Sequence, residues 1–386
     1  MLRLSRLLIL CLVLAGLACQ PGNEAAPWLS TGLPEAAPNR NRTSTITICA
    51  VGDIMAHGAQ LDAAYNAGTK TYCFRSCFTH VAPVLKSADI TIGNLETTLA
   101  GKDKGYTGYP AFNTPETLAD ALQEAGFDLL TTANNHCLDR QEYGLRRTLD
   151  QLDARGLLHV GTARTQEERD TPVIVERKGI RVAFLAYTYG TNGIPVPKPF
   201  MVNPLHPQLM IKDIQAARAA GADIVVVCLH FGVEYQRQPN KDQRDLVRLL
   251  LAQDVDIIFG GHPHVVQPIE VVRAGDGHPQ VVAYSLGNFI SAQQGPYKDA
   301  GVMVQVQVTK DALLGTAWVS GVDYTPTWVQ RSRGFRVLNV PQAIAEYDQG
   351  KAKGIGASDY RQLNQVWKDT TTHLGDVSLQ VVLPDK

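Results

Sequence analysis

The sequence lacks a surplus of charge of either sign. Its 386 residues include 36 Lys and Arg against 37 Asp and Glu, which gives a formal net charge of −1 at pH 7. Without an overall basic field, electrostatic attraction cannot hold nucleic acid or an anionic membrane to the chain as a whole. Aromatic residues are scarce, at 7%, which disfavours a site that stacks nucleobases and hence a nucleotide phosphatase. The 45% of hydrophobic residues still suffice for a large folded core.

The placement of the seven cysteines excludes a zinc knuckle. Cys73 and Cys77 form one closely spaced pair, and no second pair with similar spacing follows, as a zinc knuckle would require. In an oxidising compartment this pair could close a small disulfide loop. Cys49 and Cys228 stand in apolar runs, so we expect both to be buried in strands.

The N-terminal apolar run is too short to cross a membrane. It spans residues 7–18, follows Arg3 and Arg6, and ends directly before Cys19, whereas a spanning helix needs about 20 residues. This pattern is typical of an export signal, and its end resembles a bacterial lipobox. We therefore expect residues 1–19 to be a signal peptide with lipidation at Cys19, and simple cleavage is the alternative. A lipid there would hold the exported protein on a membrane surface of the cell envelope.

The remaining chain divides into three segments. Residues 20–44 are rich in Pro, Ala and Asn without periodicity, which predicts a flexible tether. From residue 45 to 325, short apolar runs alternate with amphipathic segments, and residues 171–190 have the pattern of a hairpin. This predicts an α/β domain, a layered sandwich with mixed β-sheets flanked by helices. Residues 326–386 contain two helix-like stretches and are expected to form a C-terminal helical appendage.

Polar residues able to bind metal follow most of the predicted strands. They are Asp53, Asn94, Glu96, Asn135, His136, His230, His262 and His264. Singly, most have a simpler interpretation, such as a helix cap for Asp53 or a first-turn acid for Glu96. Because ligands bind outside the carboxyl ends of strands in open α/β sheets, their recurrence there favours one shared cleft.

The Gly-Gly-His-Pro-His segment at 260–264 is the strongest local signal. Its two glycines permit close backbone approach to a ligand, and Pro263 stiffens the chain. In an extended segment His262 and His264 would face opposite ways, so they need a bend to reach one metal, or they serve two. The mixed nitrogen and oxygen donors suit Mn, Fe or Zn rather than Ca. A pair of such ions would support hydrolysis or phosphoryl chemistry.

Six motifs, taken together, carry a family resemblance. They are GDIMAH (52–57), GNLET (93–97), TTANNHCLD (131–139), CLHFGVEY (228–235), GGHPHVVQP (260–268) and YSLGNFI (284–290). In this order they resemble the capsule-synthesis proteins of the CapA type, associated with poly-γ-glutamate, whose domain is similar to the calcineurin-like metallophosphoesterases.

The resemblance implies a role for each strand-end residue. It makes Asp53 and His264 ligands of a first metal, Asn135, His230 and His262 ligands of a second, and Glu96 the bridging carboxylate. His136 becomes the proton donor, oriented by Asp139 or Asp53. Further candidates are His57, Asn94, Glu234 and Asn288. His57 stands four residues after Asp53, whereas metallophosphoesterases begin with Asp-x-His.

These observations predict an exported metal-dependent hydrolase with two divalent ions. It would act in capsule or envelope polymer biosynthesis, on a phosphoester or a γ-glutamyl amide. The expected partners are an anionic polymer or phosphoester and a membrane surface, with no nucleic acid. The alternative is a non-enzymatic accessory or polymer-binding subunit of a membrane capsule synthase. The loops at 101–114 and 188–201, with their Gly, Pro and Tyr, are expected to set the substrate.

Overall fold

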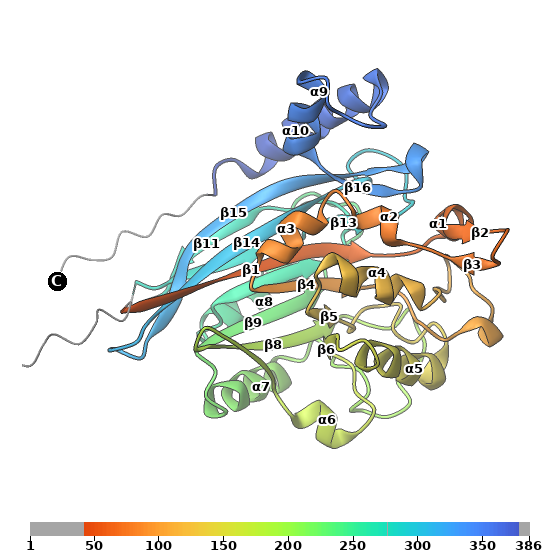
Figure 1. Ribbon diagram of the computed structural model, residues 1–386. Helices are drawn as coiled ribbons and strands as arrows, with labels where there is room; N and C mark the ends of the chain where they lie inside the picture. The colour runs from red at the N-terminus through yellow and green to blue at the C-terminus, as the bar shows by residue number, and fades with distance from the viewer. Residues whose placement is uncertain (1–41, 276, 378–386) are drawn as a thin grey trace, which may run out of the picture. The chain divides into compact units, whose positions relative to one another are not determined.

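Two mixed β-sheets lie at the centre of the fold, and their facing surfaces share one hydrophobic core (Figure 1). The computed structural model describes residues 42–377 except residue 276. The expected signal peptide, Cys19 and the tether as far as residue 41 lie outside the described residues.

The first sheet has eight strands in the order β16-β15-β14-β1-β4-β5-β6, with β13 paired to β1. Strands β1, β4, β5 and β6 run parallel, while β14, β15 and β16 form antiparallel pairs. In chain order the strands are β1 (Thr43–Ile54), β4 (Ile90–Leu95), β5 (Leu129–Thr131), β6 (Leu158–Val160), β13 (Asn288–Ile290), β14 (Ala300–Asp311), β15 (Ala317–Gln330) and β16 (Arg336–Asn339).

The second sheet has six strands in the order β11-β12-β10-β9-β8-β7. They are β7 (Val173–Arg177), β8 (Ile180–Thr188), β9 (Ile224–His230), β10 (Ile257–Gly261), β11 (Ile269–Arg273) and β12 (Pro279–Ala283). All seven residues of β9 are buried, as expected of a parallel strand covered on both faces. The predicted hairpin is confirmed, because β7 and β8 pair antiparallel. A short third sheet joins β2 (Tyr65–Asn66) to β3 (Thr71–Tyr72).

Helices cover the outer faces of both sheets, which confirms the predicted layered α/β sandwich. The first sheet packs against α1 (Gly58–Ala64), α2 (Arg75–Phe78), α3 (Ala82–Ser87) and α4 (Thr117–Ala125). The second packs against α7 (Pro207–Ala219) and α8 (Lys241–Leu251). The other helices are α5 (Gln141–Asp153), α6 (Gln166–Asp170), α9 (Val340–Asp348) and α10 (Ala357–Leu374), with 3₁₀ turns at Lys102–Lys104 and Arg331–Arg333.

Local sequence explains where α8 begins. The Asn240 side chain accepts a hydrogen bond from the Gln243 backbone N–H at 2.9 Å, and the Gln243 side chain accepts one from the Asn240 N–H at 3.0 Å. This reciprocal capping satisfies two backbone donors at the helix start. It also ends the loop that carries the chain away from His230.

The C-terminal segment differs from a purely helical appendage. The expected boundary at residue 325 lies inside β15, and β16 follows it. Helical structure begins only at Val340, where α9 and α10 pack together over Trp328 and Leu338. Among the described helices, none is both long and apolar enough to cross a membrane.

The cysteines are free thiols in the part of the chain that the structure describes. Cys49 and Cys228 are buried in strands, as predicted. Cys73 is exposed, whereas Cys77 is buried in α2 and its thiol donates to the Gly334 carbonyl at 3.4 Å. The disulfide considered for Cys73 and Cys77 is therefore not formed, because the two side chains point to different environments.

Candidate metal centre

The carboxyl ends of strands from both sheets bring five of the predicted ligands together. Asp53 is the second-last residue of β1 and Glu96 follows β4 in the first sheet, while His230 ends β9 in the second. His262 and His264 follow β10. All five side chains are buried, and Asp53 and Glu96 have no exposed surface at all.

Their donor atoms form three overlapping groups. Each group has three donor atoms that lie within 4.8 Å of one another. The groups are Asp53–Glu96–His264, Glu96–His230–His262 and Glu234–His262–His264. The shared members place these groups side by side in one cluster.

Asp53 is held by partners from both sheets. Its Oδ1 accepts a hydrogen bond from Asn94 Nδ2 at 2.8 Å. Its Oδ2 accepts one from the His262 backbone N–H at 3.2 Å and lies 2.9 Å from His264 Nδ1. Parallel pairing places Asp53 directly beside Asn94 in β4. The carboxylate therefore has a fixed position between the sheets.

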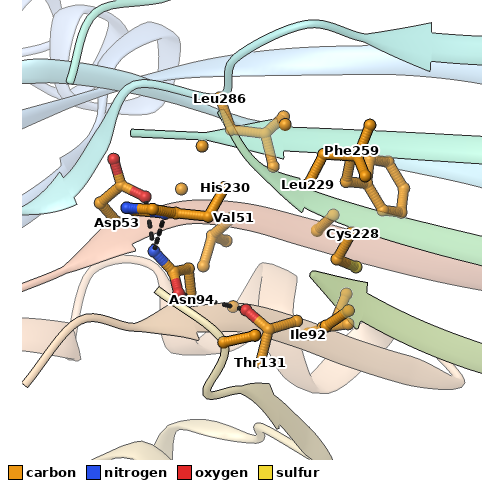
Figure 2. A pocket seen from close by; sticks show the side chains of 17 residues that line it. Val51, Asp53, Ile92, Asn94, Thr131, Cys228, Leu229, His230, Phe259 and Leu286 are labelled. Carbon is orange, nitrogen blue, oxygen red and sulfur yellow. Dashed lines mark hydrogen bonds between the residues drawn. The ribbon is translucent and has the colours of Figure 1, made fainter. Parts of the chain in front are cut away.

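Asn94 lies at the middle of the cluster rather than at its edge. Figure 2 shows its amide next to Asp53 and His230, which come from opposite sheets. Its Nδ2 reaches Glu96 Oε2 at 3.2 Å and His230 Nδ1 at 3.3 Å, in addition to Asp53. Its Oδ1 accepts hydrogen bonds from the Thr131 hydroxyl at 3.2 Å and the Asn134 amide at 3.1 Å. This network fixes the amide orientation.

Asn135 and Glu96 complete the surroundings of His230. The distance from His230 Nε2 to Asn135 Oδ1 is 2.8 Å, and to Glu96 Oε1 it is 3.6 Å. Glu96 Oε1 also lies 3.8 Å from His264 Nε2. This oxygen is buried without a hydrogen-bond partner, and so is His262 Nδ1. Two unpartnered lone pairs in one buried cluster fit a cation.

The bend that the His-Pro-His segment needs is present in its backbone. His262 has a φ of 95° and His264 a φ of 58°, both outside the range that ordinary residues prefer. Such conformations cost about 1–3 kcal/mol each and persist where surrounding structure imposes them. The bend brings both imidazoles into the cluster, with ring centres 5.9 Å apart.

Gly261 is required by the close approach of β10 to Asp53. A Cβ atom at this position would lie 2.6 Å from Asp53 Oδ1. The sequence predicted close backbone approach to a ligand at this glycine. The group that lies close to this glycine is the Asp53 carboxylate of the first sheet.

Of the two acids considered as partners of His136, Asp139 is the one whose carboxylate contacts it. The distance from His136 Nδ1 to Asp139 Oδ2 is 2.7 Å, and the Phe112 backbone N–H donates to the same oxygen at 2.6 Å. The Phe112 ring packs edge-on against the imidazole with centroids 4.7 Å apart. These contacts hold the imidazole ring. Because the Asp139 carboxylate meets Nδ1, it does not occupy the other ring nitrogen, Nε2.

Without a cation, electrostatics in the cluster favour neutral imidazoles and disfavour an ionised Glu96. Burial, and then the neighbouring Asp53, raise the pKa of Glu96 well above its usual range. Burial also lowers the pKa of His230 well below its usual range, and lowers that of His262 to about 4, with His264 contributing. Neutral imidazole is the ligating form. A divalent cation would stabilise both carboxylates, whose ion-pair partners among the described residues are histidines.

Three other predicted residues lie around the cluster. His57 begins α1, with Nδ1 3.3 Å from Gln60 Oε1, and belongs to none of the three donor groups. Asn288 donates to the backbone carbonyls of His264 at 3.3 Å and Lys298 at 2.8 Å. Glu234 is exposed and faces His262 and His264.

Comparison with known proteins identifies the family. The family model described as "Bacterial capsule synthesis protein PGA_cap" matches residues 47–293. The chain belongs to this family. The matched range contains every residue of the cluster.

Two curated proteins from Bacillus are similar to this chain. The capsule biosynthesis protein CapA of Bacillus anthracis is 31% identical over 278 residues, which cover 70% of this chain and 65% of the relative. The PGA biosynthesis protein CapA of Bacillus subtilis is 31% identical over 242 residues, covering 61% and 62%. The matches thus span less than two thirds of either relative.

Solved structures with lower similarity were also found. The calcineurin-like phosphoesterase YfkN from Bacillus subtilis has 14% identity and a TM-score of 0.44, covering 86% of this chain and 98% of that one. A 5′-nucleotidase precursor from Thermus thermophilus has 17% identity and a TM-score of 0.43, covering 85% and 59%.

Two residues beside the cluster escaped prediction. The Tyr189 ring lies 4.5 Å from that of His262 and is stacked at 6.1 Å on that of His230. The Asn192 side chain accepts a hydrogen bond from Asn135 Nδ2 at 3.2 Å. Both belong to the 188–201 loop, whose Tyr and Gly content suggested binding without indicating which residue reaches the cluster.

Proposed function

We propose that this capsule synthesis protein is an exported metal-dependent hydrolase that acts on an envelope polymer or its precursor. The observation that carries the proposal is the buried pair Asp53 and Glu96, surrounded by His230, His262 and His264. Two ionised carboxylates without a cation would be strongly destabilising at this depth. Retaining them is consistent with a site built to hold divalent ions.

The donor atoms suit two ions. Asp53 and His264 would hold one, while His230, His262 and Asn135 would hold the other, with Glu96 between them. Ions of this kind, when bound, polarise the scissile bond and supply an activated water. The nitrogen and oxygen donors favour Mn, Fe or Zn.

The chain's own residues would then position the substrate and move one proton. Asp139 holds the His136 imidazole by Nδ1, so Nε2 would be free to pass its proton to a leaving oxygen or nitrogen. The Phe112 ring against the imidazole restricts its rotation. Tyr189 covers one face of His262 and would shield the reacting groups from bulk water.

The substrate class and the cellular location form part of the same proposal. One curated relative carries "PGA biosynthesis" in its name, which supports an anionic polymer or its phosphoester precursor as substrate. The bond attacked would be a phosphoester or a γ-glutamyl amide. The leader pattern that ends at Cys19 supports export and a lipid anchor at a membrane surface, next to a capsule synthase.

Metal content and turnover together test the proposal. Protein purified without chelators is assayed by elemental analysis and against phosphodiesters and γ-glutamyl oligomers. We expect bound divalent metal in the wild type, and loss of both metal and turnover in Asp53→Asn and His262→Ala. His206→Ala, an exposed histidine at the start of α7, is the matched control and should behave like wild type.

Two results would contradict the hydrolase. One is a metal-free protein whose turnover is indifferent to His262→Ala. The other is polymer binding without turnover in metal-loaded protein, which would favour the non-enzymatic accessory.

A further inference from the structure

We propose that Lys298, held over the ring of Tyr235, is an anion-binding subsite beside the metal centre. It would take a carboxylate or phosphate of an anionic polymer, one unit away from the bond that is attacked. The inference rests on the proposed function for its setting, because it assumes that the polymer enters the metal cleft.

The first observation is that Lys298 has a fixed position but no acidic partner. Its Nζ lies 3.5 Å from the centre of the Tyr235 ring, a cation–π contact that orients the amine without neutralising it. None of the ion pairs seen among the described residues includes Lys298, whereas Lys310 in β14 pairs with Asp223. The adjacent Asp299 instead accepts a hydrogen bond from the Trp328 indole at 2.8 Å.

The second observation is that this amine lies close to the metal cluster. The Tyr235 ring centre lies 6.2 Å from that of His264. The Lys298 amine is therefore no more than 9.7 Å from the His264 ring centre, the sum of the two distances. That separation is about one Debye length at physiological ionic strength. An anion held by Lys298 and a group held at the cluster would be neighbours on one polymer.

The third observation is that backbone hydrogen bonds connect both Lys298 and Tyr235 to the segment that carries the cluster histidines. Asn288, which lies beside Asp53 in the first sheet, bonds the backbone carbonyls of both His264 and Lys298. The Tyr235 backbone N–H donates to the Pro263 carbonyl at 2.7 Å, and Tyr235 has a φ of 67°. Strained backbone at an exposed tyrosine is typical of functional sites.

The C-terminal helix α10 contacts the region around Tyr235 and Lys298. The Arg237 guanidinium lies 4.1 Å from the centre of the Tyr297 ring, next to Lys298. Its Nη2 donates to the Asp369 carbonyl in α10 at 3.2 Å. Helix α10 thus holds the loop that carries Tyr235 and the loop that carries Lys298. This gives a role to a segment outside the range that the family model matches.

The charge of the site explains why such a subsite is needed. In the metal-loaded site the ions would offset Asp53 and Glu96, but Glu234, which lies beside Tyr235 and faces His262 and His264, would still repel a polyanion. Because the whole chain has a formal net charge of −1, it exerts little attraction of its own. The fixed Lys298 amine beside the cluster would attract the anionic groups of an entering polymer. It would thereby favour extended anionic chains over small phosphoesters.

Binding and turnover of metal-loaded full-length protein test the subsite. The probes are a γ-linked glutamate oligomer, a glycerol-phosphate oligomer, and the glutamate oligomer with amidated carboxylates. A small aryl phosphodiester serves as a substrate too short to reach Lys298. The variants are Lys298→Met, Lys298→Arg and the control Lys351→Met, which removes an exposed lysine after α9.

The expected pattern is specific. Lys298→Met should weaken binding of at least one anionic oligomer about 10-fold, the loss of one charge-assisted contact. Lys298→Arg should restore most of that affinity. Binding of the amidated oligomer, turnover of the small phosphodiester and metal content should stay unchanged. The oligomer that responds identifies the anion as carboxylate or phosphate.

The outcomes separate this proposal from the hydrolase. If the protein shows no turnover but its affinity for an oligomer depends on Lys298, the subsite is supported and the proposed hydrolase activity is refuted. If the protein turns over substrate with normal metal content but Lys298→Met does not change oligomer binding, the subsite is refuted and the proposed hydrolase activity is not affected. Equal weakening by Lys351→Met would also overturn it, because any surface lysine would then suffice.

Discussion

Replacing Gly261 with alanine should damage the metal centre through a single methyl group. Gly261 ends β10 opposite His230, and the new Cβ would lie 2.6 Å from Asp53 Oδ1. Ordinary contacts at this position begin at 3.4 Å, so the carboxylate must retreat by roughly 0.8 Å. Asp53 is fully buried and held by Asn94 and His264, so it cannot turn toward solvent.

The size of this displacement sets the expected effect. Metal–ligand distances tolerate deviations of about 0.2 Å, so the required shift is several times too large for an intact site. Disturbing the support of a ligand typically lowers metal affinity about 10- to 100-fold. We expect a loss of that order for Mn²⁺, together with a destabilisation of about 1–3 kcal/mol from overpacking.

The assay is calorimetric titration of the metal-free protein with Mn²⁺, with circular dichroism to verify the fold. Gly58→Ala is the matched control, because a Cβ at Gly58 meets nothing within 4 Å and this glycine lies in α1. If Gly261→Ala bound Mn²⁺ as tightly as Gly58→Ala and wild type, Asp53 would not be a ligand and the reasoning would fail.

Two further predictions concern stability. Burial lowers the pKa of His57 to about 4 in the folded protein. Between about pH 6.5 and pH 4 the unfolded chain therefore binds more protons at this residue than the folded protein does. The free energy of unfolding should fall as the pH falls through this range, by at most about 3 kcal/mol. Urea unfolding of metal-free protein should show this loss, and His57→Asn, which retains a helix-capping residue, should reduce it; an identical pH profile would contradict the prediction. Phe289→Ala should cost about 3–5 kcal/mol in chemical denaturation, because this fully buried ring stacks on Phe78 at 5.9 Å; a loss below about 1 kcal/mol would show that the core refills the space.

The sequence was informative about which polar residues stand at strand ends. Asp53, His230 and His262 each terminate or follow an apolar run, and parallel strands bring such positions to one edge of a sheet. The alternation of runs and amphipathic segments also predicted the layers correctly. These features depend on short stretches of chain, so a single sequence reveals them.

The rest depends on contacts between distant segments. Nothing local shows that Asn288 ties the His264 loop to Lys298, or that the Phe112 backbone helps hold Asp139. The boundary placed at residue 325 lies inside β15, because the local sequence does not show how far that strand pairs with β14. Side-chain neighbours across two packed sheets follow from tertiary structure, which the periodicity of one strand does not encode.

Because the candidate ligands are divided between two sheets, bound metal would link metal supply to folding itself. Neither sheet has a complete set, since Asp53 and Glu96 belong to one and His230 and His262 to the other. An ion at 100 times its Kd that binds only the docked sheets would add about 2.7 kcal/mol to the free energy of unfolding. The same linkage makes metal affinity a measure of sheet docking. Core substitutions far from the cluster should therefore weaken metal binding in proportion to how much they loosen the sandwich.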